Sequence, residues 1–170
     1  LFEAFPDDYT LVPSQVVAQA CVAILTAPLL ERFLQLVRQQ SNDWAATLAE
    51  RLLALCGARV PQVWSVRLDT AGAPALEQAL RHGEAIGLGV LTGDGGISSL
   101  PLLIERADRQ LLLLPDGATR LQAGDHLLFA GRRTARSEQM LLLNNVNALD
   151  QALGKPQAGS WFGRWLARRA

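Results

Sequence analysis

The apolar period of the sequence changes at Gly57. Before it, residues 28–40 and 43–56 repeat apolar side chains at the spacing of helices. After it, residues 63–69 alternate apolar and polar side chains, as a half-buried strand does. A chain that passes from one period to the other contains both helices and a sheet. We therefore predict an α+β fold, in which an N-terminal helical hairpin is followed by a small α/β lobe.

The predicted lobe contains several short apolar runs separated by turn residues. A short helical pattern covers residues 75–82, and a turn at 106–109 joins two of the runs into a hairpin. We therefore expect a mainly antiparallel sheet. The predicted strands cover 85–91, 100–105, 110–114 and 126–131, and the continuous apolar character of the first is typical of a central strand.

A long uncharged stretch precedes the hairpin. Residues 9–30 carry no charged side chain, and 22 positions are enough to cross a bilayer. Two prolines and several polar side chains interrupt this stretch, which favours a strand over 8–12 and a helix over 15–26 instead of a membrane span. The sequence begins with leucine and not with methionine, which predicts that the chain is part of a longer protein.

Basic groups concentrate at the C-terminal end. Residues 1–130 hold nine basic and fourteen acidic groups, whereas residues 131–170 hold seven and two. A helix over 161–169 would be amphipathic, with tryptophans suited to a membrane interface and arginines suited to anionic lipid head groups. Contact with a membrane surface, packing against the protein and disorder all fit this tail. Nucleic-acid binding is not indicated, because no basic stripe is interleaved with aromatic residues.

The two predicted helices of the hairpin are apolar over an unusually wide part of their surface. Such helices need neighbours on two sides. Burial within one subunit and packing against a second copy explain this pattern equally well. In the second case the dimer interface would be formed by Leu29, Leu30, Phe33, Leu34, Val37, Trp44, Leu48 and Leu52.

Residue types that catalysis and metal binding require are sparse. His82 and His126 are the only histidines, and they are not clustered with cysteines or carboxylates at metal-ligand spacing. Cys21 and Cys56 lie on separate apolar helical patterns, which favours buried free thiols. The glycines at 87–96 lack the spacing and the following helix of a dinucleotide-binding turn. The sequence therefore predicts no enzyme, no catalytic residue, no metal site and no cofactor for this part of the protein.

The stretch 115–131, PDGATRLQAGDHLLFAG, resembles the end of a TrkA-C lobe, which is the C-terminal half of the RCK domain (regulator of potassium conductance). Residues 63–91 are similar to the first strand, helix and second strand of that lobe, and residues 7–25 resemble the last strand and helix of a preceding TrkA-N lobe. The resemblance divides the chain into the end of a TrkA-N-like lobe with crossover helices (1–57), a TrkA-C-like lobe (58–136) and a C-terminal tail (137–170).

This resemblance implies a cytoplasmic regulatory domain of a bacterial potassium channel or a related cation transporter, at the inner face of the cell membrane. Such domains bind a small ligand or ion, form homodimers or higher rings, and pass the change to a transmembrane pore or transporter subunit. It therefore favours dimerisation through the helical hairpin, and it is compatible with a nucleotide or divalent-ion site in the full-length protein. The alternatives are a structural dimerisation module without its own ligand, and a small soluble enzyme with a histidine beside a carboxylate.

The resemblance also suggests roles for particular residues. Arg81, His82 and Arg106 are predicted to bind the ligand, near a cleft between two C-lobes. Gly124 and Asp125 are predicted to form a structural turn, because glycine reaches backbone angles closed to other residues and aspartate can bind the backbone of a turn.

Overall fold

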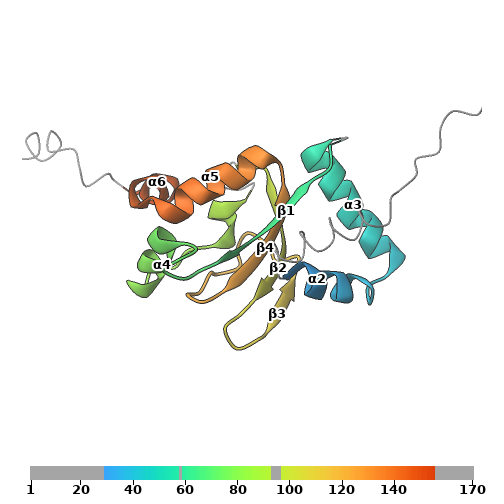
Figure 1. Ribbon diagram of the computed structural model, residues 1–170, viewed down its shortest axis with the longest axis horizontal. Helices are drawn as coiled ribbons and strands as arrows, with labels where there is room; N and C mark the ends of the chain where they lie inside the picture. Colours follow the sequence, from blue (N-terminus) through green and yellow to red (C-terminus); the bar gives the residue numbers. More distant parts are fainter. Residues whose placement is uncertain (1–28, 58, 93–96, 156–170) are drawn as a thin grey trace, which may run out of the picture.

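The computed structural model describes residues 29–57, 59–92 and 97–155, which adopt an α+β arrangement (Figure 1). The predicted α+β class and mainly antiparallel sheet are confirmed. The elements follow one another as α2 (Leu29–Val37), α3 (Asn42–Cys56), β1 (Gln62–Arg67), α4 (Pro74–Arg81), the 3-10 helix η1 (Leu88–Leu91), β2 (Ser99–Glu105), β3 (Leu111–Leu113), β4 (His126–Gly131), α5 (Arg133–Asn144) and α6 (Val146–Ala152).

The four strands form a single antiparallel sheet in the order β1-β4-β2-β3. Strand β4 lies inside this sheet and pairs with β1 on one side and β2 on the other. The sequence predicted both β4 and the β2–β3 hairpin, and both are confirmed. Every residue of β4 after His126 is buried, as expected for a strand that has neighbours at both edges and on both faces.

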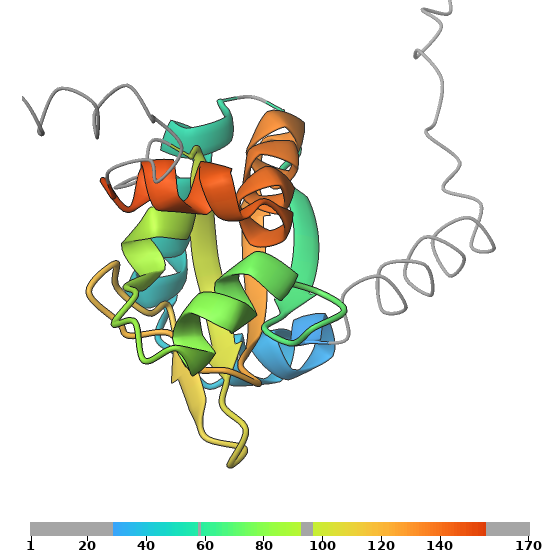
Figure 2. The same ribbon diagram turned by 90° about the vertical axis from the view of Figure 1, so that its left-hand side faces the viewer.

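Helices cover both faces of the sheet, so the fold has three layers. Helices α4, α5 and α6 lie on one face, as the view in Figure 2 shows, and α2 and α3 lie on the other (Figure 1). Alternate residues of the strands point into two separate apolar cores. In β1, for example, Trp64 and Val66 belong to the core beneath α4–α6, whereas Val63 packs against the core beneath α2 and α3.

A buried polar network fixes α5 to the sheet. Gln139 is completely buried, and its Nε2 donates hydrogen bonds to the Leu91 carbonyl (2.5 Å) and to Ser99 Oγ (2.9 Å). Its Oε1 accepts a hydrogen bond from Trp64 Nε1 at 2.8 Å, and the Trp64 ring stacks on Phe129 with the ring centroids 6.0 Å apart. One side chain of α5 therefore joins η1, β1 and β2.

Residues 85–91 do not form the central strand that their apolar character predicted. They contain an isolated bridge between Gly87 and Arg120 and then the 3-10 helix η1. The backbone of this segment bonds to the loop at 117–121, through Leu88 N to Thr119 O (2.8 Å) and other pairs. Burial on several sides explains the apolar run, because a buried 3-10 segment and a buried strand have the same composition.

Part of the predicted C-terminal tail, residues 137–170, is helical, because it contains most of α5 and the whole of α6. Helices α5 and α6 pack against α4 and contribute Ala135, Leu143 and Leu149 to the core beneath them. The described chain therefore contributes to this core as far as α6.

The hairpin of α2 and α3 packs on the sheet of its own chain. Of the residues predicted for a dimer interface, Leu29, Phe33 and Leu48 are buried in that core, and Leu30, Val37, Trp44 and Leu52 pack against it. Only Leu34 of this set is exposed. The chain's own sheet therefore accounts for the wide apolar stripe, and dimerisation through the hairpin stays a prediction.

None of the helices within the described ranges has both the length and the apolar character needed to cross a bilayer. Cys56 is buried as a free thiol, as predicted. The predicted strand 8–12, the predicted helix 15–26, Cys21 and the tail 161–169 lie outside the described residues.

Gly131 ends β4 where the backbone of another strand lies unusually close. A Cβ atom at this position would lie 2.7 Å from the Ser98 carbonyl oxygen and 3.1 Å from the Trp64 ring. We expect Gly131→Ala to lower the free energy of unfolding by about 1–2 kcal/mol, because backbone must shift to make room. Urea denaturation measures this change. Gly57→Ala serves as a control without steric overlap, because a Cβ atom at Gly57 would have no atom within 4 Å. Its only cost is the backbone strain of a φ of 64°.

Candidate functional site

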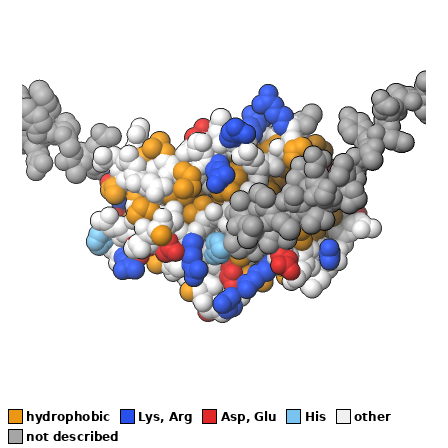
Figure 3. All heavy atoms as spheres, viewed as in Figure 1, with side chains coloured by type: hydrophobic (Ala, Val, Ile, Leu, Met, Phe, Trp, Pro, Cys, Tyr) orange, Lys and Arg blue, Asp and Glu red, His pale blue; other side chains and the backbone are white. Residues whose placement is uncertain are grey.

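A polar cavity of about 190 Å³ opens at one end of the sheet, beside the β2–β3 turn. We call it the arginine pocket. In Figure 3, basic and acidic side chains are interleaved along the lower margin of the molecule, where this hairpin lies in Figure 1. The pocket is lined by Arg67, Glu105, Arg106, Ala107, Arg109, Gly124 and His126.

The strand register assembles the floor of the arginine pocket. Arg67 of β1 pairs directly with His126 of β4, and His126 pairs directly with Glu105 of β2. Because directly paired residues of antiparallel strands point to the same face, these three side chains form a row across the sheet. The row ends the apolar core beneath α2 and α3, since Leu128 and Leu103 occupy the same face further along.

Two further arginines reach the row from outside the three strands. Arg109 lies in the β2–β3 turn with a φ of 71°, an uncommon conformation for a residue with a side chain. Its Nη1 donates a hydrogen bond to Glu105 Oε1 at 3.2 Å. Arg32 of α2 donates to the same oxygen. Glu105, whose side chain is 11% exposed, thus binds the hairpin and the turn at once.

Arg106 holds the turn in front of β4. Its Nη1 donates to Asp125 Oδ2 at 2.5 Å, and its Nη2 donates to the Arg120 carbonyl at 2.9 Å. Asp125 also accepts a hydrogen bond from Gln122 N at 2.9 Å. Gly124, with a φ of 87°, donates its N–H to the Leu68 carbonyl at 2.7 Å. The Gly-Asp pair thus lies in a turn bonded to the end of β1.

Asp125 is completely buried, and its Oδ1 has no hydrogen-bond partner among the described residues. Burial raises the pKa of this carboxyl above its usual value, and it outweighs the Gln122 hydrogen bond and the Arg106 guanidinium, which lower it. Keeping this carboxyl ionised in the turn therefore costs free energy. Arg106 is its only charged hydrogen-bond partner among the described residues.

Burial also lowers the pKa of His126, and the nearby positive charges of Arg67 and Arg32 lower it further, against the opposite influence of Glu105. The imidazole is therefore uncharged at neutral pH and can donate one hydrogen bond and accept another. The side chain of His126 is half-buried in the row of the arginine pocket.

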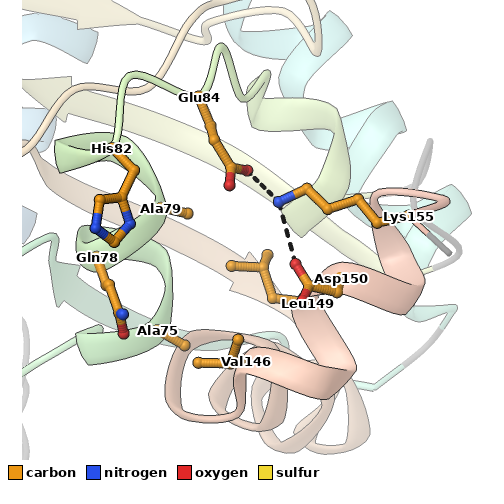
Figure 4. A pocket seen from close by; sticks show the side chains of 9 residues that line it. All are labelled: Ala75, Gln78, Ala79, His82, Glu84, Val146, Leu149, Asp150 and Lys155. Carbon is orange, nitrogen blue, oxygen red and sulfur yellow. Dashed lines mark hydrogen bonds and ion pairs between the residues drawn. The ribbon is translucent and has the colours of Figure 1, made fainter. Parts of the chain in front are cut away.

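A second cavity, of about 390 Å³, lies between α4 and α6 (Figure 4). Its floor is apolar, with Ala79 and Leu149 facing each other across it. At its rim, Lys155 Nζ binds the carboxylates of Glu84 and Asp150. The hydrogen bond to Glu84 is the main cause of a raised pKa for Lys155, so its ammonium stays charged throughout the physiological range.

The structure separates the three residues that were predicted to bind a ligand. His82 lines the cavity between α4 and α6, whereas Arg106 lines the arginine pocket. Arg81 lies on α4 and forms an ion pair with Glu77. A single site containing all three is therefore not formed within the described chain.

Sequence reasoning missed Arg67, Glu105 and Arg109 as pocket residues. Their placement depends on the strand order β1-β4-β2, which the local period of a strand does not reveal. An available signal was the charged side chain at or beside the end of each of three predicted strands.

The charged groups of the described chain do not form a metal centre. Within 29–57, 59–92 and 97–155, no three His, Cys, Asp or Glu side chains lie close enough together to hold a metal ion. Comparisons of the chain with protein-family models, with curated proteins and with solved structures returned no match.

Proposed function

We propose that this chain is the regulatory domain of a potassium channel or cation transporter, in which a ligand at the arginine pocket controls the position of the α2–α3 hairpin. The observation that carries the proposal is the shared use of Glu105. One carboxylate oxygen accepts hydrogen bonds from Arg32 on the hairpin and from Arg109 at the pocket. A change in the Arg109–Glu105 bond at the pocket would therefore alter the Arg32–Glu105 bond that holds the hairpin.

The coupling follows from competition for a single acceptor. A bound ligand that draws Arg109 toward itself leaves Glu105 Oε1 to Arg32 alone, which strengthens the contact between α2 and the sheet. A ligand shifts an equilibrium between two arrangements only by its difference in affinity for them. Here the difference arises from the Arg109–Glu105 bond, which the ligand replaces in one arrangement.

The pocket supports binding more than catalysis. Its lining residues include no serine, threonine or cysteine that could act as a nucleophile. The carboxylate that lines it, Glu105, is already bonded by Arg32 and Arg109. A non-enzymatic, ligand-binding role is therefore the proposal that these groups favour.

The outer surface of the hairpin is the part available to a partner. Leu34 and Leu53 are 47% and 61% exposed, although the opposite sides of their helices are packed on the sheet. In the proposed assembly these residues meet a second copy of the chain or the transmembrane subunit at the cytoplasmic side of the membrane.

Arg32→Ala, introduced into the native gene of the cells that produce this protein, tests the proposal. Energetic coupling between two sites is typically worth a factor of five or more, so we expect potassium uptake to change about fivefold. Arg38→Ala is the matched control, because Arg38 is an exposed arginine just beyond α2 whose side chain has no hydrogen bond to the described residues. Equal uptake in the parent and both variants, at equal protein levels, would contradict the proposal.

A further inference from the structure

We infer that the arginine pocket binds a phosphate group. This inference rests on the proposed function, because it assigns the chemical class of the ligand at the same site. Its basis is the arrangement of charges around the cavity, two of which are only weakly paired.

Three guanidinium groups line the pocket, and a fourth, that of Arg32, is bonded to the lining residue Glu105. Two of the four are held by buried carboxylates. Arg106 is 11% exposed and bound to Asp125, and Arg32 is bound to Glu105. The other two, Arg67 and Arg109, are 64% and 74% exposed in their side chains. Their charges are the ones that a ligand can reach from solvent.

The pairing of these two arginines is weak. Arg67 has its nearest carboxylate oxygen, from Asp69, at 3.7 Å, and Arg109 shares one oxygen of Glu105 with Arg32. The Arg67–Asp69 pair is exposed and contributes little free energy, and in the Arg109–Glu105 pair the arginine is the exposed partner. An anion that offers several oxygen atoms can therefore replace these contacts at small cost and gain charge-assisted hydrogen bonds.

The two arginines lie on opposite sides of His126. Arg67 is on β1 and Arg109 follows β2, while His126 is on β4 between those strands. Strands that are second neighbours in a sheet lie about 10 Å apart, which leaves room for one tetrahedral anion between two guanidinium forks. The uncharged His126 ring can donate its N–H to an oxygen of the same anion.

The dimensions and chemistry of the cavity favour the phosphate group over a larger or an apolar ligand. A cavity of about 190 Å³ holds a single phosphate but not a nucleotide, so any organic part of the ligand would extend into solvent. The fork of a guanidinium matches two oxygens of a phosphate. Arg109, in the β2–β3 turn, presents one such fork at the rim.

Titration of the isotope-labelled 170-residue chain by NMR tests the inference, with inorganic phosphate and glycerol 3-phosphate as separate probes and chloride at equal ionic strength as the reference. We expect saturable shifts at the amides of residues 107–110 and 126. Saturation by both probes identifies a monoester site, and saturation by inorganic phosphate alone identifies free phosphate as the ligand.

Substitutions at the rim provide the second part of the test. Because a hydrogen bond to a charged group contributes about 1.5–3 kcal/mol, we expect Arg67→Gln and Arg109→Gln each to weaken phosphate binding about tenfold or more. The matched control, Arg136→Gln, removes the same charge from an exposed position on α5 and should leave the affinity within about twofold. Absence of saturable shifts with either probe, or equal affinity in all variants, overturns the phosphate site.

Hydrogen exchange in the same samples separates this inference from the proposed function. Phosphate that withdraws Arg109 from Glu105 should slow amide exchange in α2. Saturable binding without that slowing supports the phosphate site and contradicts control of the hairpin. Slowing that is lost in Arg32→Ala, with phosphate affinity retained, supports both.

Discussion

Replacing Arg106 with alanine is expected to lower the free energy of unfolding by about 3–5 kcal/mol at neutral pH, because the variant retains a buried carboxylate without its positive partner. Asp125 is completely buried and cannot turn its charge toward water without opening the turn before β4. Urea denaturation followed by circular dichroism measures the loss.

The cost of Arg106→Ala should depend on pH in a definite direction. Burial already raises the pKa of Asp125 in the folded protein above the usual 3.8. The stability that this group contributes is therefore present below that value and is lost as the pH rises through its folded pKa. Removing Arg106 raises the folded pKa further, so the difference between variant and parent should be largest at neutral pH and should shrink in the acid range.

Two matched variants define the origin of this effect. Arg109→Ala removes an arginine of the same hairpin that is 74% exposed, and it should cost less than about 1 kcal/mol. Combining Arg106→Ala with Asp125→Asn should recover part of the lost stability, because no charge then remains buried. If Arg106→Ala alone is as stable as the parent at neutral pH, the role given to Arg106 is contradicted.

Gln139→Ala is the second substitution for which we expect a large effect, a loss of about 3 kcal/mol. It leaves Trp64 Nε1 without its acceptor in the core and opens a cavity between α5 and the sheet. Thermal and urea denaturation measure the loss. The indole N–H signal of Trp64 should also shift in the NMR spectrum of the folded variant.

Gln139→Met separates the hydrogen bonds from the packing, because methionine fills a similar volume but offers only a weak acceptor to the indole. We expect it to cost about 1–3 kcal/mol. Glu138→Ala, at the exposed neighbouring position, should change stability by less than about 0.5 kcal/mol. If the variants at 138 and 139 behave alike, the network does not hold α5 in place.

The elements that the sequence predicted are those with a local pattern and a clear boundary. Strand β4 begins just after Gly124 and Asp125 and ends at Gly131, and its observed bounds agree with the predicted ones. The β2–β3 hairpin was predicted from its turn residues. In these cases the local conformation and the tertiary environment favour the same structure.

Helix α5 shows why a local pattern can fail. Its Gln139 is polar although completely buried, while Leu141 on the same helix is 57% exposed. The hydrophobic period is therefore weak and did not indicate a helix, and the resemblance assigned the residues from 137 onward to a tail. Only the partners of Gln139, which come from distant parts of the chain, explain its burial.

The candidate site was predictable only in part for a related reason. Arg106 was selected from the sequence, but its hydrogen bond to Asp125 was not predicted. The row of Arg67, His126 and Glu105 exists because β4 lies between β1 and β2. That strand order is a long-range property, and no window of sequence around any one of these residues contains it.

The division of the apolar interior by the sheet has a consequence for how the molecule opens. Helices α2 and α3 share their core with one face of the sheet only, whereas the Gln139 network and the packing of α4, α5 and α6 lie on the other. The hairpin can therefore behave as a separate cooperative unit that lifts away while the remaining two layers stay folded. Its departure would expose Leu103 and Leu128 as part of one apolar surface. An exposed apolar surface of this kind favours association with another molecule, so partial opening alone would produce a form of the protein that associates.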